Sequence, residues 1–280
     1  MSTPLPSTRD ENLASRLESS PMSNSSANLV ALGTIVRREI VRIMRIWTQT
    51  LIPPAITMTL YFVIFGKLIG SRIGTIQGGF SYMQYIVPGL VMMSIITNSY
   101  GNISSSFFGA KFSRAVEEML VSPMPNWVIL LGYVTGAVTR GLVVGVLVLL
   151  IALFFTSLHV AHPVITFFSV LLGSTIFSLA GFVNAVYAKK FDDIALVPTF
   201  VLTPLTYLGG VFYSVNMLAE PWQAISRANP ILYMVNAFRY GVLGISDVSI
   251  ATAFIVMLGF VAALSAVALH LLERGVGLRS

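Results

Sequence analysis

Long apolar runs, separated by short polar segments, dominate the chain from Trp47 to Leu272. Six of these runs are long enough to cross a bilayer, because roughly 20 apolar residues in a helix match its hydrocarbon thickness. Lipid offers the backbone no hydrogen-bond partners, so a spanning segment of this kind must be helical. The pattern therefore predicts an all-α integral membrane protein with six transmembrane helices, at about residues 47–66, 83–108, 127–155, 163–188, 194–213 and 249–272.

The chain before the first span divides into two parts. Residues 1–28 are rich in serine and contain no apolar run, which predicts a disordered tail ahead of a single domain over 29–280. From residue 29 to 47 the apolar positions recur with a helical period, and an arginine face lies opposite them. This pattern predicts an amphipathic helix on the membrane surface, serving either as an anchor or as a contact for a partner. The apolar face comprises Leu29, Leu32, Val36, Ile40, Ile43 and Trp47, and the basic face Arg38, Arg42 and Arg45.

Composition and charge agree with a membrane protein. Of 280 residues, 55% are hydrophobic and 10% are charged, against about 25% charged in soluble domains. The net charge is +6, but the basic residues form no aromatic-interleaved patch of the kind that binds nucleic acid. Their bias toward one side predicts both termini in the cytoplasm of a multi-pass inner (plasma) membrane protein. In that orientation Lys67, Arg72, Arg227 and Arg239 lie outside and Arg140 lies within the third span.

Several residues within the spans could have either of two roles, in the transport path or in helix packing. Arg140 is costly in a span, so it either snorkels toward the interface or pairs with another helix, or it lines a translocation path. Pro198 and Pro204 predict a bent fifth span, which either lines the path or improves packing. Polar residues of the second and fourth spans either line the path or bond between helices; they are Asn98, Tyr100, Asn102 and Asn184.

Glycines in the third span have a simpler reading. Gly132 and Gly136, and then Gly141 and Gly145, recur at the four-residue spacing that lets helices approach closely. We expect other helices to pack directly against them.

Two segments between the spans are predicted to form short helices. Residues 111–125 predict a short charged helix that ends at a proline-rich turn, either a docking element or an ordinary loop. Residues 214–248 are too broken for another crossing, and we expect them to fold back into the outer leaflet as short helices.

These features together resemble the permease subunits of type-2 ATP-binding-cassette exporters. The amphipathic helix precedes the first span, the acidic-then-proline turn follows the second, and the string NPILYMVNAFRYG precedes the sixth. The turn contains Glu117, Glu118, Leu120, Ser122 and Pro123, and the string contains Pro230, Ile231, Tyr233 and Arg239 at the family's spacing.

The resemblance implies a two-part machine. Such permeases pair with separate cytosolic ATPase subunits, usually two of each, so a second permease copy, a homodimer, is expected. It implies that Glu117, Glu118, Ser122 and Pro123 form a coupling helix on the ATPase, with Arg38, Arg42 and Arg45 in the same contact. No GxxxxGK[ST] phosphate-binding string occurs in the chain. The chain therefore has no ATP site of its own, and the resemblance implies that ATP with magnesium binds in the partner subunit; this chain is expected to bind no cofactor.

Other functions receive less support. Three histidines are scattered, without HExxH, a Cys/His cluster or GxSxG, so a metal site or a serine enzyme is not expected. An ATP-independent secondary transporter or channel remains the alternative, with a membrane scaffold behind it. We expect the exported molecule to pass between two permease copies, along the first, second and fifth spans.

Overall fold

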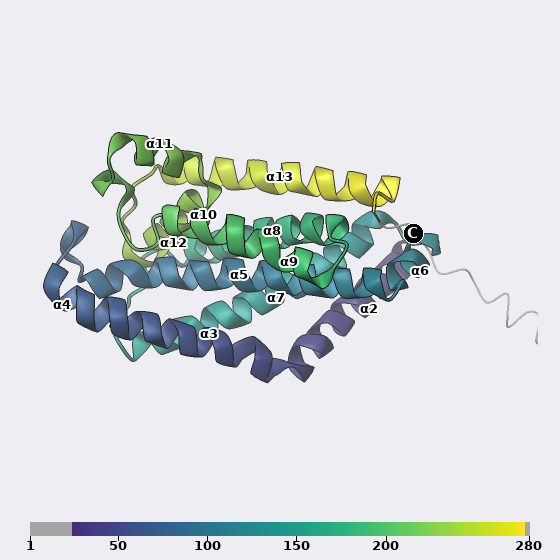
Figure 1. Ribbon diagram of the computed structural model, residues 1–280, viewed down its shortest axis with the longest axis horizontal. Coiled ribbons are helices and arrows are strands. Elements are labelled where there is room, and N and C mark those ends of the chain that lie inside the picture. The colour runs from purple at the N-terminus through teal and green to yellow at the C-terminus, as the bar shows by residue number, and fades with distance from the viewer. Residues whose placement is uncertain (1–23, 278–280) are drawn as a thin grey trace, which may run out of the picture.

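The computed structural model describes residues 24–277, and over this range the regular structure is helical. The helices run mostly parallel to one long axis (Figure 1). Their bounds are α2 Asn24–Arg45, α3 Trp47–Tyr61, η1 Phe62–Ile69, α4 Gly70–Ile73, η2 Gln77–Gly79, α5 Tyr82–Phe112, α6 Ala115–Val121, α7 Asn126–Leu153, α8 Pro163–Tyr187, α9 Phe191–Val197, η3 Pro198–Leu202, α10 Thr203–Leu208, η4 Val215–Met217, α11 Glu220–Ala228, α12 Pro230–Leu243 and α13 Ile250–Arg274.

Five helices in the described range are long and apolar enough to cross a membrane. Five of the six expected spans thus have a counterpart of the right length and composition. The remaining one, α5, has 31 residues, which is more than a crossing needs, but polar residues interrupt it. The five are Trp47–Ile73, Asn126–Leu153, Pro163–Tyr187, Phe191–Leu208 and Ile250–Arg274.

Helix α5 occupies the centre of the bundle. It packs most extensively against α8 and α7 and also touches α12, and in Figure 1 it lies between α3 and α13. Its start is defined by a capping box, in which Ser81 Oγ accepts from the Gln84 backbone N–H and Gln84 Oε1 accepts from that of Ser81. Because protein surrounds most of α5, its polar side chains can meet other helices rather than lipid.

The predicted close packing at glycines of α7 is confirmed. A Cβ built on Gly141 would stand 2.0 Å from Ser99 Oγ of α5, and one on Gly145 would stand 2.7 Å from Ile95. At the other end of α7, Gly132 and Gly136 receive helix α2 in the same way. Neighbouring helices therefore touch the α7 backbone directly, which larger residues would prevent.

Helix α2 lies oblique to the long helices, at one end of the bundle (Figure 1). It begins at Asn24, so residues 24–28 are helical rather than part of the expected tail, and residues 1–23 lie outside the described range. Its buried positions are Ile35, Glu39 and Ile43, whereas Ile40, assigned to the apolar face, is exposed. The helix and its period are confirmed. The side that packs on the bundle includes the carboxylate of Glu39, which the sequence pattern assigned to neither face.

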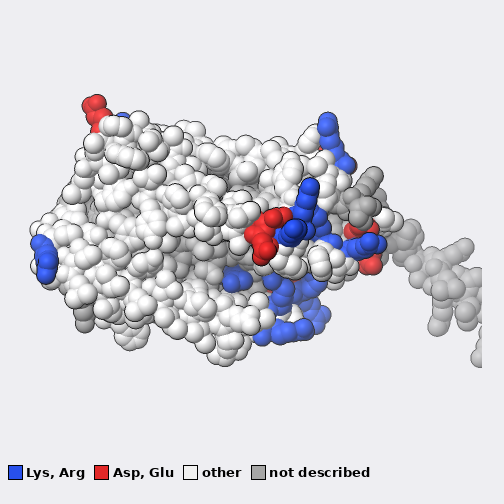
Figure 2. Space-filling view, in the orientation of Figure 1, with Lys and Arg blue, Asp and Glu red and all other residues white. Residues whose placement is uncertain are grey.

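Charged side chains gather at one end of the bundle, and a wide uncharged belt separates them from the few at the other end (Figure 2). We call the charged end the basic end: it carries α6, the α8–α9 connection and the last turn of α13. Helix α2 begins and α13 ends at this same end (Figure 1).

The first and fifth spans are irregular. The first continues from α3 into the π-helical segment η1, and the fifth is divided into α9, π-helical η3 and α10. Pro198 opens η3, and Thr203 Oγ1 donates to the Pro198 carbonyl at 2.9 Å. The Thr203 backbone N–H donates to the same carbonyl, so the π-helical turn keeps this carbonyl bonded where prolines interrupt the span. Residues 214–248 form the short helices η4, α11 and α12, as expected.

Candidate functional site

A buried carboxylate joins α2 to α5. Glu39 is 1% exposed, and Ser106 Oγ of α5 donates to it at 2.7 Å. Arg42, one turn further along α2, pairs with the same carboxylate at 3.0 Å. A buried charge needs both a counter-charge and hydrogen bonds; Arg42 supplies the first, and the bonds to Ser106 and Asn102 of α5 hold α2 against the bundle. No sequence pattern marked Glu39, because its partner Ser106 is 67 residues away.

The network continues from Arg42 to Arg140. Arg42 donates to Asn102 Oδ1 at 2.7 Å, and Arg140 of α7 approaches the same oxygen at 3.5 Å. Arg140 also approaches Asn98 Oδ1 at 3.5 Å, while its buried Nε has no partner. The structure thus brings together three residues considered as path residues, Arg140, Asn98 and Asn102, and adds Arg42, which sequence reasoning placed on the outward face.

Arg38 and Arg45 of α2 remain accessible. Arg38 is partly exposed, stacks over the Tyr133 ring and donates to its hydroxyl. Arg45 is exposed. The three arginines considered for partner contact therefore differ: Arg38 and Arg45 can meet a partner, whereas Arg42 acts inside the bundle.

One stripe of α5 faces open space. Thr97 and Ser105 are exposed, and Gly101 between them has no atom within 4 Å of an added Cβ. We call these three residues the α5 stripe. Tyr100 and Asn102, considered as wall residues, are buried instead. The four-residue spacing of small and polar residues was visible in the sequence, but it identifies a wall only once the other faces of α5 are known to be covered.

A cavity of about 290 Å³ lies beside this stripe. Residues of α3 and α5 form most of its wall, and Arg140 of α7 joins them; the lining residues are Gln49, Pro53, Pro54, Thr57, Met58, Tyr61, Met93, Ser94, Thr97, Asn98 and Arg140. We call it the α3–α5 cavity.

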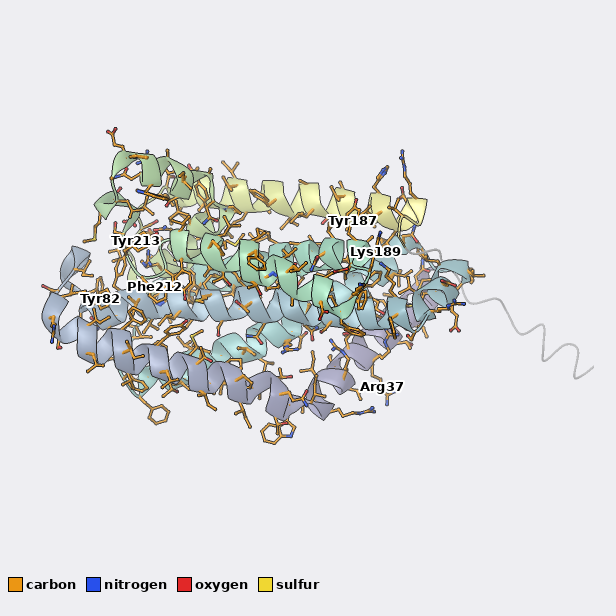
Figure 3. All side chains as sticks on the ribbon, viewed as in Figure 1. Arg37, Tyr82, Tyr187, Lys189, Phe212 and Tyr213 are labelled. Carbon is orange, nitrogen blue, oxygen red and sulfur yellow. The ribbon has the colours of Figure 1, made fainter. Side chains whose placement is uncertain are left out.

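Aromatic residues surround Tyr61, at the end of this cavity farthest from α2. Tyr61 and Tyr207 of α10 approach through their hydroxyls at 3.5 Å, and Phe212 packs on Tyr61, Phe65 and Tyr207 with ring centroids 4.8–6.0 Å apart. Tyr82 donates to the Phe212 carbonyl at 3.2 Å, and Figure 3 shows Tyr82, Phe212 and Tyr213 far from Tyr187 and Lys189 of the basic end. The first and fifth spans therefore meet over α5 away from the basic end.

The fifth span is less buried than the helices behind it. Pro204 is exposed and Pro198 is half-buried. Asn184 of α8 donates its amide to the Ile194 carbonyl at 3.3 Å. Asn184 thus bonds between helices and supports this span instead of facing the cavity.

The acidic segment after α5 forms α6, as expected. Arg114 adopts a left-handed conformation, with φ of 62°, and turns the chain from α5 into α6. Val116 is buried and Val121 is 87% exposed. Glu117 and Glu118 lie in the first turn, and Ser122 ends the helix before Pro123. The helix is therefore fixed on one side and free on the other.

Lysine 111 ties this region to the end of α8. Its ammonium donates to the carbonyls of Val186 and Ala188 at 2.6 and 2.8 Å. These are among the last carbonyls of α8, which lack helical partners. A movement of α6 would therefore be transmitted to both α5 and α8.

The NPILYMVNAFRYG string forms α12 and has a structural part in the bundle. Asn229 caps the helix by accepting from the Ile231 N–H, Pro230 occupies the first position, and Tyr233 donates to the Arg227 carbonyl at 2.7 Å. Ile231 packs against Gly209, where an added Cβ would stand 2.6 Å away.

Arg239 of α12 is buried, although it was counted among the outer charges. It lies over the Tyr85 ring, 4.0 Å from its centroid, and donates to the Gly210 carbonyl at 2.6 Å. It therefore holds the turn that ends the fifth span against α5 and is not a surface charge.

Comparison with known proteins identifies the family to which the chain belongs. The family model for the ABC-2 type transporter matches residues 30–243, which run from α2 through α12. The chain belongs to the ABC-2 type transporter family. It is 60% identical to the inner membrane transport permease YadH of Escherichia coli (strain K12), over 90% of this chain and 98% of that protein. Nodulation protein J of Rhizobium meliloti (strain 1021) is 29% identical over 66% of this chain and 71% of its own length.

Membership of the ABC-2 family makes the chain a membrane permease subunit rather than an enzyme. ATP with magnesium acts in the partner ATPase of such transporters and not in the permease. Within residues 24–277 no three His, Asp or Glu side chains gather as metal ligands would.

Proposed function

We propose that two copies of this permease form an export path between them, and that a separate cytosolic ATPase drives it. The α5 stripe carries the proposal. In a helix buried on its other faces, Thr97, Gly101 and Ser105 are open, small or polar, which suits a wall along which a solute moves.

The spans beside the stripe support a second copy. Only 12% of the apolar window of Trp47–Ile73 and 11% of that of Phe191–Leu208 is buried, close to the 11% of α13 and far below the 50% of α8. The first two flank α5 (Figure 1). A facing copy would cover these surfaces and close the path on its open side.

Six crossings, with α5 as the second, agree with the arrangement of the ends. An even number returns the chain to the side where it began, and α2 begins and α13 ends at the basic end (Figure 1). The excess of Lys and Arg there supports a cytoplasmic basic end in the inner membrane. In this orientation α11 and α12 fold back on the outer side.

The basic end then receives the ATPase. Helix α6 presents Glu118 and Val121 outward, and α2 presents Arg38 and Arg45. We assign Glu117, Ser122 and Pro123 to the same contact, through the shape of the α6 turn. Arg42 would pass the movement of α2 on to Asn102 of the path helix.

Single-cysteine variants can test this path because the natural chain has no cysteine. We expect Thr97→Cys and Ser105→Cys to react with a small polar maleimide at rates that change when the partner ATPase binds ATP. Leu150→Cys, at an exposed position of α7, is the matched control and should not respond. Stripe variants that behave like Leu150→Cys would contradict the proposed path.

The energy source needs its own experiment. We expect vesicles containing the permease with a hydrolysis-dead ATPase to export nothing. Uphill transport by the permease alone, at the expense of a proton or sodium gradient, would instead establish the secondary transporter.

A further inference from the structure

The guanidinium group of Arg140 lines the α3–α5 cavity and forms no ion pair with a carboxylate among the described residues. Glu39 is the carboxylate in both ion pairs found among residues 24–277, and its partners there are Arg38 and Arg42. Arg140 takes part in neither. With three arginines around one carboxylate, this cluster carries two excess positive charges, and Arg140 is the member that lines the cavity.

The hydrogen bonds of Arg140 are also incomplete. Its two contacts to Asn98 and Asn102 are both 3.5 Å long, at the outer limit for a hydrogen bond. Asn102 Oδ1 is already engaged by Arg42 at 2.7 Å, and the Arg140 Nε is buried without a partner. A guanidinium group has five N–H donors in a planar fork, which suits the oxygens of a carboxylate, phosphate or sulfate.

The rest of the cavity indicates what such an anion is attached to. Gln49, Thr57 and Thr97 supply polar groups around it, while Ile52 and Ile56 on the adjacent surface of α3 are exposed and apolar. Arg140 lies halfway along the 28 residues of α7, one of the helices long and apolar enough to cross a membrane. A ligand that reaches it from the bilayer therefore needs an acidic head and an apolar tail.

We propose that the α3–α5 cavity binds the acidic head group of the exported molecule, and that this molecule is an anionic amphiphile. The assignment rests on the proposed export function and specifies its substrate class. Arg140 binds the acid, Asn98 and Thr97 border it, and the tail lies along the apolar surface of α3. Tyr61 and its aromatic neighbours close the far end of the cavity, so the bound head would remain below them until the first and fifth spans separate.

Binding can be measured on the full-length protein without ATP or ATPase. The probes are hexyl phosphate, hexyltrimethylammonium and hexanol, titrated by calorimetry into delipidated protein in a neutral detergent. We expect hexyl phosphate to bind at least roughly tenfold tighter than either of the others, the factor typical of one hydrogen bond to a charged group. Equal affinity for the three probes would overturn the proposal.

Variants locate the site. Arg140→Gln should remove the preference for hexyl phosphate and Arg140→Lys should keep part of it. Arg227→Gln removes an exposed arginine of α11 and should have no effect. Should Arg140→Gln fail to fold, Thr97→Trp fills the cavity from its exposed side and should weaken hexyl phosphate alone. Binding that survives these changes would overturn the assignment.

Two further measurements distinguish an anionic amphiphile from free phosphate and from a resident phospholipid. Inorganic phosphate binding as tightly as hexyl phosphate would exclude an amphiphile as the preferred ligand. A stoichiometric phospholipid that hexyl phosphate cannot displace would assign the cavity to a resident lipid and overturn its role in substrate binding. Because no ATP is present, a positive result with no ATP-driven export would refute the proposed function but not the anion site.

Discussion

Replacing Gly136 by alanine tests whether α2 is held at the distance that its polar bonds require. The added Cβ would stand 2.5 Å from Glu39 Cβ and 2.9 Å from its Cγ. Carbon atoms pack at about 3.5–4.0 Å, so α2 must retreat by about 1 Å or more. Glu39 Cβ is fixed to the backbone of α2, and rotation of the side chain therefore gives no relief.

The retreat breaks the bonds of the buried carboxylate. A shift of about 1 Å would lengthen the 2.7 Å contact from Ser106 to Glu39 beyond hydrogen-bond range. Overpacking costs about 1–3 kcal/mol, and a buried group left unsatisfied costs about 1–3 kcal/mol. Alanine regains about 1 kcal/mol of helix propensity. We expect a net loss of roughly 1–5 kcal/mol in the free energy of unfolding, from the sum of these terms.

The assay is equilibrium unfolding of the full-length protein in mixed micelles, followed by circular dichroism. Gly33→Ala is the matched control, because it adds the same methyl group to α2 where nothing lies within 4 Å. We expect that variant to be as stable as the natural protein or slightly more so. If Gly136→Ala were as stable as Gly33→Ala, the close contact between α2 and α7 would be refuted.

Three further predictions concern charge, path and docking. Glu39→Leu leaves Arg42 without its buried partner and should cost about 3–5 kcal/mol of unfolding free energy, measured in the same micelles; a smaller loss than for Gly136→Ala would argue against a buried ion pair. Ser105→Trp should block export in vesicles while changing stability by no more than about 0.5 kcal/mol, as an exposed substitution does, and undiminished transport would remove α5 from the path. Val121→Asp should abolish co-purification of the ATPase, whereas Phe154→Asp, at a residue 89% exposed beyond α7, should retain it; equal recovery with both would place the contact elsewhere.

Hydrophobic periodicity alone located the long helices well. The expected spans at 163–188 and 249–272 correspond to α8 (Pro163–Tyr187) and α13 (Ile250–Arg274), because length and apolarity are local properties that a bilayer selects directly. The same holds for α6, which the proline-rich turn ends, and for the glycines of α7 against which α2 and α5 pack. These features depend on a few neighbouring residues, so one sequence suffices to predict them.

The buried side of each helix depended on the other helices. Periodicity assigned Glu39 no role, yet the structure buries it together with Ile35 and Ile43, because Ser106 and Arg42 offset the desolvation of its carboxylate. Arg239 is likewise buried, because its guanidinium group stacks over the Tyr85 ring and donates a hydrogen bond to the Gly210 carbonyl. Hydropathy assigns a fixed cost to a charged side chain, whereas the actual cost depends on partners far away in the chain.

The sequence by itself therefore determined that the protein is a bundle of membrane helices with a short acidic helix between two of them. Only the tertiary structure decided that α5 lies at the centre, that Thr97, Gly101 and Ser105 remain open, and that Arg140 faces a cavity without a counter-charge. The first set follows from the transfer of each segment into lipid, a free energy that is nearly additive along the chain. The second follows from contacts between segments, which exist only when all the helices are in place.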